Sequence, residues 1–147
     1  MKRGEIREIG NPAMVERLAE DLCEQGPLAG IPVNVVADVI RSAAMVELET
    51  GELLVREGEA ATPEVYLLLE GSLAVQAKTG FIARLDKPGD VIGEAAVVLH
   101  SKRNADVVAE TAVRALSIPA AVLAEAEFAE VAAGIRSAML RDDWVQY

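Results

Sequence analysis

The chain has the length and composition of one folded domain: 147 residues, of which 52% are hydrophobic and 26% charged, values typical of globular rather than disordered proteins. Its formal net charge of −10 disfavours DNA or RNA as a partner, because such binding depends on Lys and Arg side chains that contact phosphates. A small anion is still a reasonable ligand, since a local pocket acts over a few ångströms and surface charge is screened beyond about 8 Å at physiological salt.

The N-terminal part is predicted to be helical. The first ten residues, MKRGEIREIG, have no apolar run behind their basic side chains, which is not the pattern of a secretory signal. An amphipathic helix is predicted over residues 11–23, with Asn11 as its N-cap and Pro12 at the first helical position. Glycines and prolines in 24–32 indicate a connection, and a second amphipathic helix follows over 32–43.

From residue 45 the pattern changes to short β-strands separated by turn residues. The expected strands are MVELE, ELLV, VYLLLE, SLAVQA and FIARLD, then, after an irregular segment, NADVVAE and AVRALSI. Strands of this length and spacing predict a sandwich or barrel with helices at its ends.

The C-terminal segment returns to a helical period. Apolar or small side chains recur every three or four residues from Phe128 to Met139, which predicts one long helix from near Pro119 to residue 144. Its apolar face would pack on the barrel, form a dimer seam or cover a ligand as a lid.

No segment has the features of a membrane span or of a cysteine-based site. The best apolar stretch, 33–48, is interrupted by Asn34, Asp38, Arg41 and Glu47, whereas a membrane helix needs about 20 apolar residues. The single cysteine, Cys23, cannot form an internal disulfide or a thiolate metal site, and we expect it in the core of a helix. The sequence therefore predicts a cytoplasmic protein without a membrane partner.

Residues 88–111, PGDVIGEAAVVLHSKRNADVVAET, are too irregular for a plain hairpin. Gly89 and Gly93 bracket a short strand, and 93–96 can open one helical turn whose first N–H groups have no internal partners. Such a helix start attracts an anion through these N–H groups and its dipole.

Glycine turns precede this segment in a set order. They are Gly51-Glu52, Gly58-Glu59, Val65-Tyr66 through Glu70-Gly71, and Pro88-Gly89-Asp90, followed by Gly93-Glu94-Ala95-Ala96 and Arg103-Asn104-Ala105. In this order the motifs resemble the cyclic-nucleotide-binding domain family over about residues 28–141. The resemblance implies a mainly β fold with flanking helices, a double-stranded β-helix or jelly-roll barrel with N-terminal helices and a C-terminal lid or dimerisation helix. Residues 1–31 would be an N-terminal helical extension and 32–147 the cyclic-nucleotide-binding domain.

The resemblance also assigns roles to residues. Arg103 would pair with the equatorial phosphate oxygens of cAMP or cGMP. Glu94 would accept a hydrogen bond from the ribose 2′-hydroxyl, and nearby backbone N–H groups would donate to the phosphate. The predicted ligand-binding residues are Ile92, Gly93, Glu94, Ala95, Ala96, Arg103, Asn104 and Ala105, with Val75, Arg136, Met139 and Leu140 as possible base contacts.

Asn104 departs from the family pattern, which has Ala, Ser or Thr after the arginine. Its bulk can crowd the phosphate, so a choice between adenine and guanine does not follow from this site. The alternative is a module that kept the fold, lost its ligand and serves dimerisation or protein docking.

An enzyme is disfavoured. A cupin-type metal site would need several histidines and a carboxylate, and the chain has one histidine, His100. No Ser or Cys lies in a recognisable nucleophile elbow. The sequence predicts no catalytic residue, metal or cofactor.

The predicted function is that of a regulatory sensor. Binding of cAMP or cGMP would shift an equilibrium between two positions of the C-terminal helices. Because no helix-turn-helix follows these helices in the sequence, we expect no direct DNA binding and an action on a separate effector protein, or a place as fragment or subunit in a larger system. A homodimer through the C-terminal helix is a further possibility.

Overall fold

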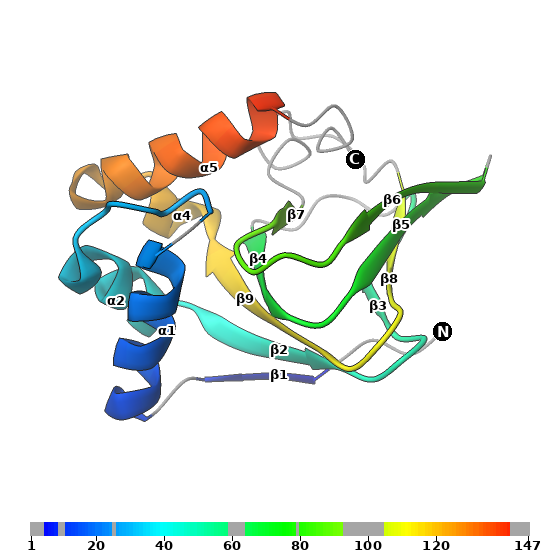
Figure 1. The fold of residues 1–147 in the computed structure, drawn as a ribbon, viewed down its shortest axis with the longest axis horizontal. Helices are drawn as coiled ribbons and strands as arrows, with labels where there is room; N and C mark the ends of the chain where they lie inside the picture. Colours follow the sequence, from blue (N-terminus) through cyan, green and yellow to red (C-terminus); the bar gives the residue numbers. More distant parts are fainter. Residues whose placement is uncertain are drawn as a thin grey trace.

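Two antiparallel sheets lie beside a group of helices in the computed structural model (Figure 1). The structure describes residues 5–8, 11–24, 26–58, 64–78, 80–92 and 105–141, with the backbone alone for 5–8, 82 and 138–141. Within these ranges, no helix is both long and apolar enough to span a bilayer.

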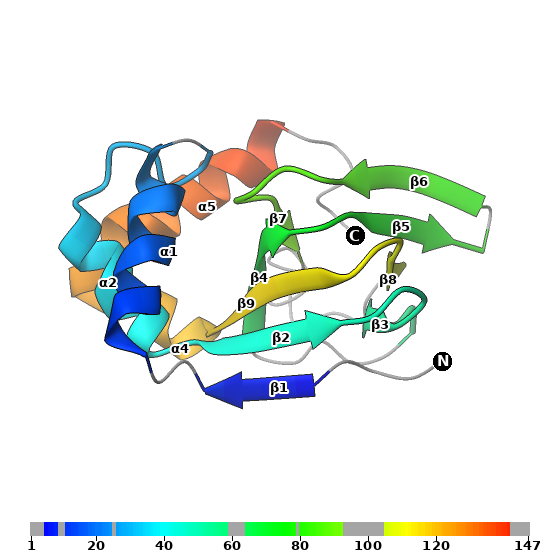
Figure 2. The ribbon, with the colours of Figure 1, turned by 60° about the horizontal axis from the view of Figure 1, so that its bottom comes forward.

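The two N-terminal helices pack against each other at one end of the sheets (Figures 1 and 2). Helix α1 (Pro12–Glu24) begins as predicted: Asn11 Oδ1 accepts a hydrogen bond of 3.0 Å from the Ala13 N–H. Helix α2 (Val33–Arg41) buries Val36, Val39 and Ile40 on one face.

The larger sheet has five strands in the order β1-β2-β9-β4-β7. Their bounds are Glu5–Glu8 for β1, Ala44–Leu48 for β2, Val113–Pro119 for β9, Glu64–Glu70 for β4 and Val91–Ile92 for β7. Strand β9 is the central strand and pairs with β2 and β4 along nearly its whole length. Figure 2 shows it between these neighbours, with β1 at the edge.

The smaller sheet has four strands in the order β3-β8-β5-β6. They are β3 (Leu53–Val55), β8 (Asp106–Ala109), β5 (Leu73–Ala77) and β6 (Gly80–Leu85). Strands β5 and β6 form a hairpin that extends away from the helices (Figure 1).

Two hydrophobic cores lie on opposite faces of the five-stranded sheet, and β4 contributes to both. Val65 and Leu67 pack against the helices in one of them, the helix-side core, whereas Tyr66 and Leu68 face the four-stranded sheet in the other, the core between the sheets. Alternate residues of a strand point to opposite faces, so the apolar run VYLLL is explained by burial on both sides. Mainly antiparallel sheets with flanking helices confirm the predicted fold class.

The structure confirms the predicted strands and corrects the prediction at both ends. Strand β1 was not predicted; it pairs with β2 in the register Glu5↔Glu47. The prediction of one long C-terminal helix is wrong. The chain instead forms α4 (Ala120–Leu123), the 3-10 turn η1 (Ala126–Phe128) and α5 (Ala129–Arg141). The break lies at Glu125, whose backbone is extended, with φ −70° and ψ 138°.

The four turn glycines of the sequence pattern all have positive φ: 91° at Gly51, 85° at Gly58, 95° at Gly71 and 93° at Gly89. This conformation is unfavourable for side chains with a Cβ. At Gly71 space is lacking as well, because a Cβ there would lie 2.3 Å from the Ala112 carbonyl oxygen. Glycine is therefore required at this turn for two separate reasons.

Candidate functional site

The chain enters the predicted phosphate-binding segment through a tightly fixed turn. The Gly89 N–H donates to the Leu68 carbonyl at 2.7 Å, and the Leu68 N–H donates to the Asp90 carbonyl at 2.9 Å. The Asp90 carboxylate also accepts a bond of 3.1 Å from the Lys87 N–H, which closes the turn. Strand β7 then pairs with β4, with Ile92 opposite Tyr66 and only 3% exposed.

The chain leaves the segment at Ala105, which is completely buried. The next residue, Asp106, begins β8 between β3 and β5. Its carboxylate accepts a 2.7 Å hydrogen bond from the Glu57 N–H, two residues beyond the end of β3. Both ends of the predicted binding segment are thus held by the sheets, one end by each sheet.

The residues predicted to contact phosphate and ribose, Gly93, Glu94, Ala95, Ala96, Arg103 and Asn104, lie outside the described residues. The structure places only the first and last members of the predicted set, Ile92 and Ala105, and both contribute to the core between the sheets. Their burial means that the segment starts and ends in apolar surroundings.

The possible base contacts lie on two different elements. Val75 is on β5, 1% exposed in the core between the sheets. Arg136 is exposed on α5, and Met139 and Leu140 follow on the same helix, where their side chains are outside the described part. The geometry that would bring these residues to one base remains a prediction.

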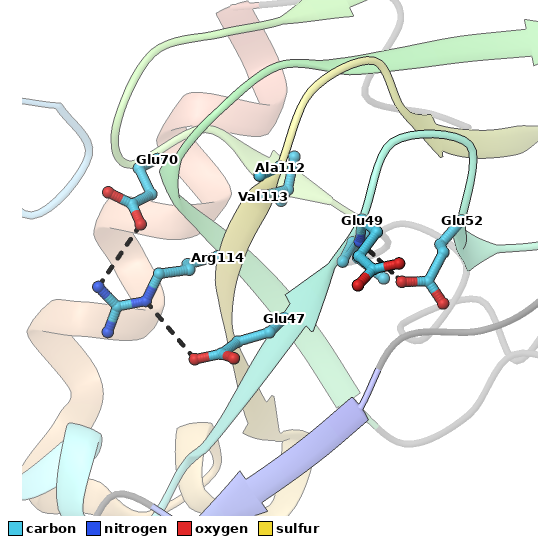
Figure 3. Close-up of a pocket in the computed structure, with 8 residues that line it drawn as sticks. Glu47, Glu49, Glu52, Glu70, Ala112, Val113 and Arg114 are labelled. Atoms are coloured by element: carbon cyan, nitrogen blue, oxygen red, sulfur yellow. Dashed lines mark hydrogen bonds and ion pairs between the residues drawn. The ribbon is translucent and has the colours of Figure 1, made fainter.

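A separate pocket of about 370 Å³, which the sequence did not reveal, lies on the five-stranded sheet (Figure 3). Arg114 of β9 extends between Glu47 of β2 and Glu70 of β4. Its Nε lies 3.9 Å from Oε1 of Glu47, and its Nη1 lies 3.5 Å from Oε1 of Glu70. Glu49 and Glu52 complete the charged lining, and the Glu52 carboxylate accepts a 2.7 Å hydrogen bond from the Glu49 backbone N–H. Four glutamates around one arginine make this pocket a poor site for a phosphate. Only strand register, which the sequence does not display, could have revealed it.

The described ranges hold no cluster of three or more His, Cys, Asp and Glu side chains arranged to bind a metal ion. His100, the residue considered for a metal site in the sequence, lies outside them. Cys23 is half-buried on α1, next to the helix-side core, and burial raises the pKa of its thiol. A neutral thiol is a poor metal ligand and a poor nucleophile.

The model of the cyclic nucleotide-binding domain family matches residues 45–127. The chain belongs to this family. The match contains both fixed ends of the segment just described, together with all four glycine turns. A comparison with curated protein sequences finds no significant match.

Solved structures share this family's fold with the chain. A regulatory subunit of a cAMP-independent protein kinase A from Trypanosoma brucei is 22% identical, with a TM-score of 0.74 over 92% of this chain and 49% of that one. The regulatory domain of Toxoplasma gondii PKA, crystallised with cAMP, is 18% identical, with a TM-score of 0.70 over 92% and 50%. A cyclic nucleotide-binding domain from Methylobacillus flagellatus is 16% identical, with a TM-score of 0.74 over 92% and 82%. The chain spans about half the length of the first two proteins.

Proposed function

We propose that this cyclic nucleotide-binding domain is a sensor that binds cAMP or cGMP through residues 93–105. The observation that supports it best is the position of Ile92 and Ala105, which hold the two ends of the segment in buried positions on opposite sheets. Between them, Arg103 would bind the cyclic phosphate and Glu94 the ribose 2′-hydroxyl, as in the family pattern. The T. gondii regulatory domain, which was crystallised with cAMP, has the same fold.

The output of the sensor would be a movement of the C-terminal helices. Phe128, Val131 and Ile135 of η1 and α5 pack in the helix-side core and are at most 4% exposed. A ligand that favours one position of α5 therefore has to change this packing, and its differential affinity sets the size of the shift. In this proposal the domain is a non-catalytic, cytoplasmic module that acts on a separate effector protein, with a homodimer through α5 as one arrangement.

Calorimetric titration tests the ligand class and the site together. We expect heat of binding with cAMP or cGMP and much less with 5′-AMP, which lacks the cyclic phosphodiester. Arg103→Ala should weaken binding by about 2 kcal/mol, or about 30-fold, because a charge-assisted contact is lost. The neighbouring Lys102→Ala is the matched control and should leave the affinity within about threefold of the wild type.

A second titration tests the role of Glu94. The wild type should bind 2′-deoxy-cAMP more weakly than cAMP, whereas Glu94→Ala should bind both ligands with similar affinity, because the two changes remove the same hydrogen bond. A ligand at one hundred times its dissociation constant should also raise the unfolding free energy by about 2.7 kcal/mol. Absence of both heat and thermal stabilisation with cAMP and cGMP would contradict the proposal and favour the ligand-free docking module.

A further inference from the structure

Helix α5 approaches the connection between α1 and α2 more closely than any side chain would permit. A Cβ built on Gly134 of α5 would lie 2.3 Å from the carbonyl oxygen of Pro27 and 3.3 Å from its carbonyl carbon. Both are backbone atoms, which cannot rotate out of the way. Glycine is unfavourable inside a helix, so the close contact explains why this position has no side chain.

The other side of Pro27 contacts the turn that leads into the predicted binding segment. A Cβ built on Gly89 would lie 3.0 Å from Cδ of Pro27, and one built on Gly26 would lie 3.4 Å from the Pro88 carbonyl oxygen. Gly89 is buried, although it belongs to a turn. Figures 1 and 2 both show the α1–α2 connection next to α5 and next to the segment that joins β6 to β7.

Residues 26–30 of the connection are held by backbone hydrogen bonds. The Ala29 N–H donates to the Gly26 carbonyl at 3.1 Å, and the Gly30 N–H donates to the Cys23 carbonyl at 3.2 Å. Leu28, the residue after Pro27, is 1% exposed in the helix-side core. The residues next to Pro27 are therefore held in place by backbone hydrogen bonds and by the core.

We infer that Pro27 and Gly134 are positioning residues that couple α5 to the entrance of the nucleotide-binding segment. Gly89 is three residues before Ile92, and its N–H is bonded to Leu68 of β4, so the turn and β7 move as one unit. A shift of α5 would push on Pro27, and Pro27 would push on Gly89. The consequence for ligand affinity rests on the proposed function, whereas the mechanical link does not.

Amide hydrogen exchange in the full chain tests the link without any ligand. Gly134→Ala should accelerate exchange of the Gly89 and Leu68 amides about tenfold or more, because their hydrogen bonds lie on the far side of Pro27. The Ala109 amide, bonded to the Glu52 carbonyl at 2.9 Å at the other end of the sheets, should not change. Ser137→Ala, which alters an exposed residue of the same helix, is the matched control and should leave all three amides unchanged.

A second variant adds no volume and cannot fail through a clash. Pro27→Ala removes the ring atoms against Gly89 and should accelerate exchange at the same two amides. Unchanged exchange at Gly89 and Leu68 in Pro27→Ala, or in a folded Gly134→Ala whose α5 amides do respond, would overturn the inference.

Ligand affinity distinguishes this inference from the proposed function. If the wild type binds cAMP, Gly134→Ala should bind it about fivefold or more weakly, a coupling of ordinary size. Faster exchange with unchanged affinity would overturn the step from Pro27 to the ligand. A wild type that binds no cyclic nucleotide contradicts the proposed function, and the exchange experiment still decides the mechanical link.

Discussion

Replacement of Gly71 by alanine is expected to destabilise the domain through two separable effects. The backbone at Gly71 has φ of 95°, and a left-handed conformation costs an alanine about 1–2 kcal/mol. The new methyl group would also lie 2.3 Å from the Ala112 carbonyl oxygen and 2.8 Å from Cγ2 of Val113. Forcing an extra carbon into such a site costs about 1–3 kcal/mol. The two effects sum to about 2–5 kcal/mol, which is a large part of the free energy of unfolding of a typical domain, about 5–15 kcal/mol.

Gly51→Ala separates the two effects. Gly51 has nearly the same φ, 91°, but a Cβ there meets no atom within 4 Å. Urea denaturation at 25 °C should therefore show that Gly51→Ala lowers the free energy of unfolding by about 1–2 kcal/mol. Gly71→Ala should lower it by about 1–3 kcal/mol more than Gly51→Ala does. Equal losses in the two variants would refute the argument that contact with the β8–β9 turn makes glycine necessary at position 71.

Two further predictions concern side-chain hydrogen bonds. Asn11→Ala should lower the unfolding free energy by about 1 kcal/mol in denaturant titration, because the Ala13 N–H loses its acceptor, while Asn11→Asp should stay near the wild type; equal losses in the two variants would contradict the cap. Hydrogen bonds from Arg84 and then Ser72 lower the pKa of Glu110 from 4.5 to about 2. The stability that Glu110 contributes is therefore present above pH 4.5 and lost as the pH falls towards about 2. The difference in Tm between the wild type and Glu110→Gln should become smaller as the pH falls over this range. It should also become smaller at high salt, since the Arg84–Glu110 ion pair is partly exposed. A difference in Tm that stays constant down to pH 2 would exclude this ion pair as its cause.

The sequence predicted most of the fold because its signals were local. Asn11 and Pro12 mark the start of α1, and the glycines at 51, 58, 71 and 89 occupy turns that need positive φ. Strand β1 was missed because EIRE is short, with one apolar residue, and its pairing with β2 is a tertiary contact. The break before α5 was missed for a related reason. Neither Gly nor Pro interrupts the segment around Glu125, and the burial of Phe128 in the helix-side core follows from packing.

At the candidate site, too, the sequence predicted the local features and missed the tertiary contacts. The family pattern predicted the segment that contains Glu94 and Arg103, and the structure describes the strands that hold its ends, Ile92 and Ala105. The sequence pattern could not predict the contact between Pro27 and Gly134. This contact joins residues more than a hundred positions apart, and a glycine inside a helix has several possible causes.

The attachment of the C-terminal helices to β9 would restrict the movement proposed for these helices. Strand β9 pairs with β2 as far as Ser117 and with β4 as far as Pro119, so its end is held by backbone hydrogen bonds. The chain then crosses one short helical turn and the extended Glu125 before α5 begins. In the proposed sensor, a rotation of α5 would have to occur within these connecting residues, about ten in number, and the end of α5 near Arg141 would move furthest.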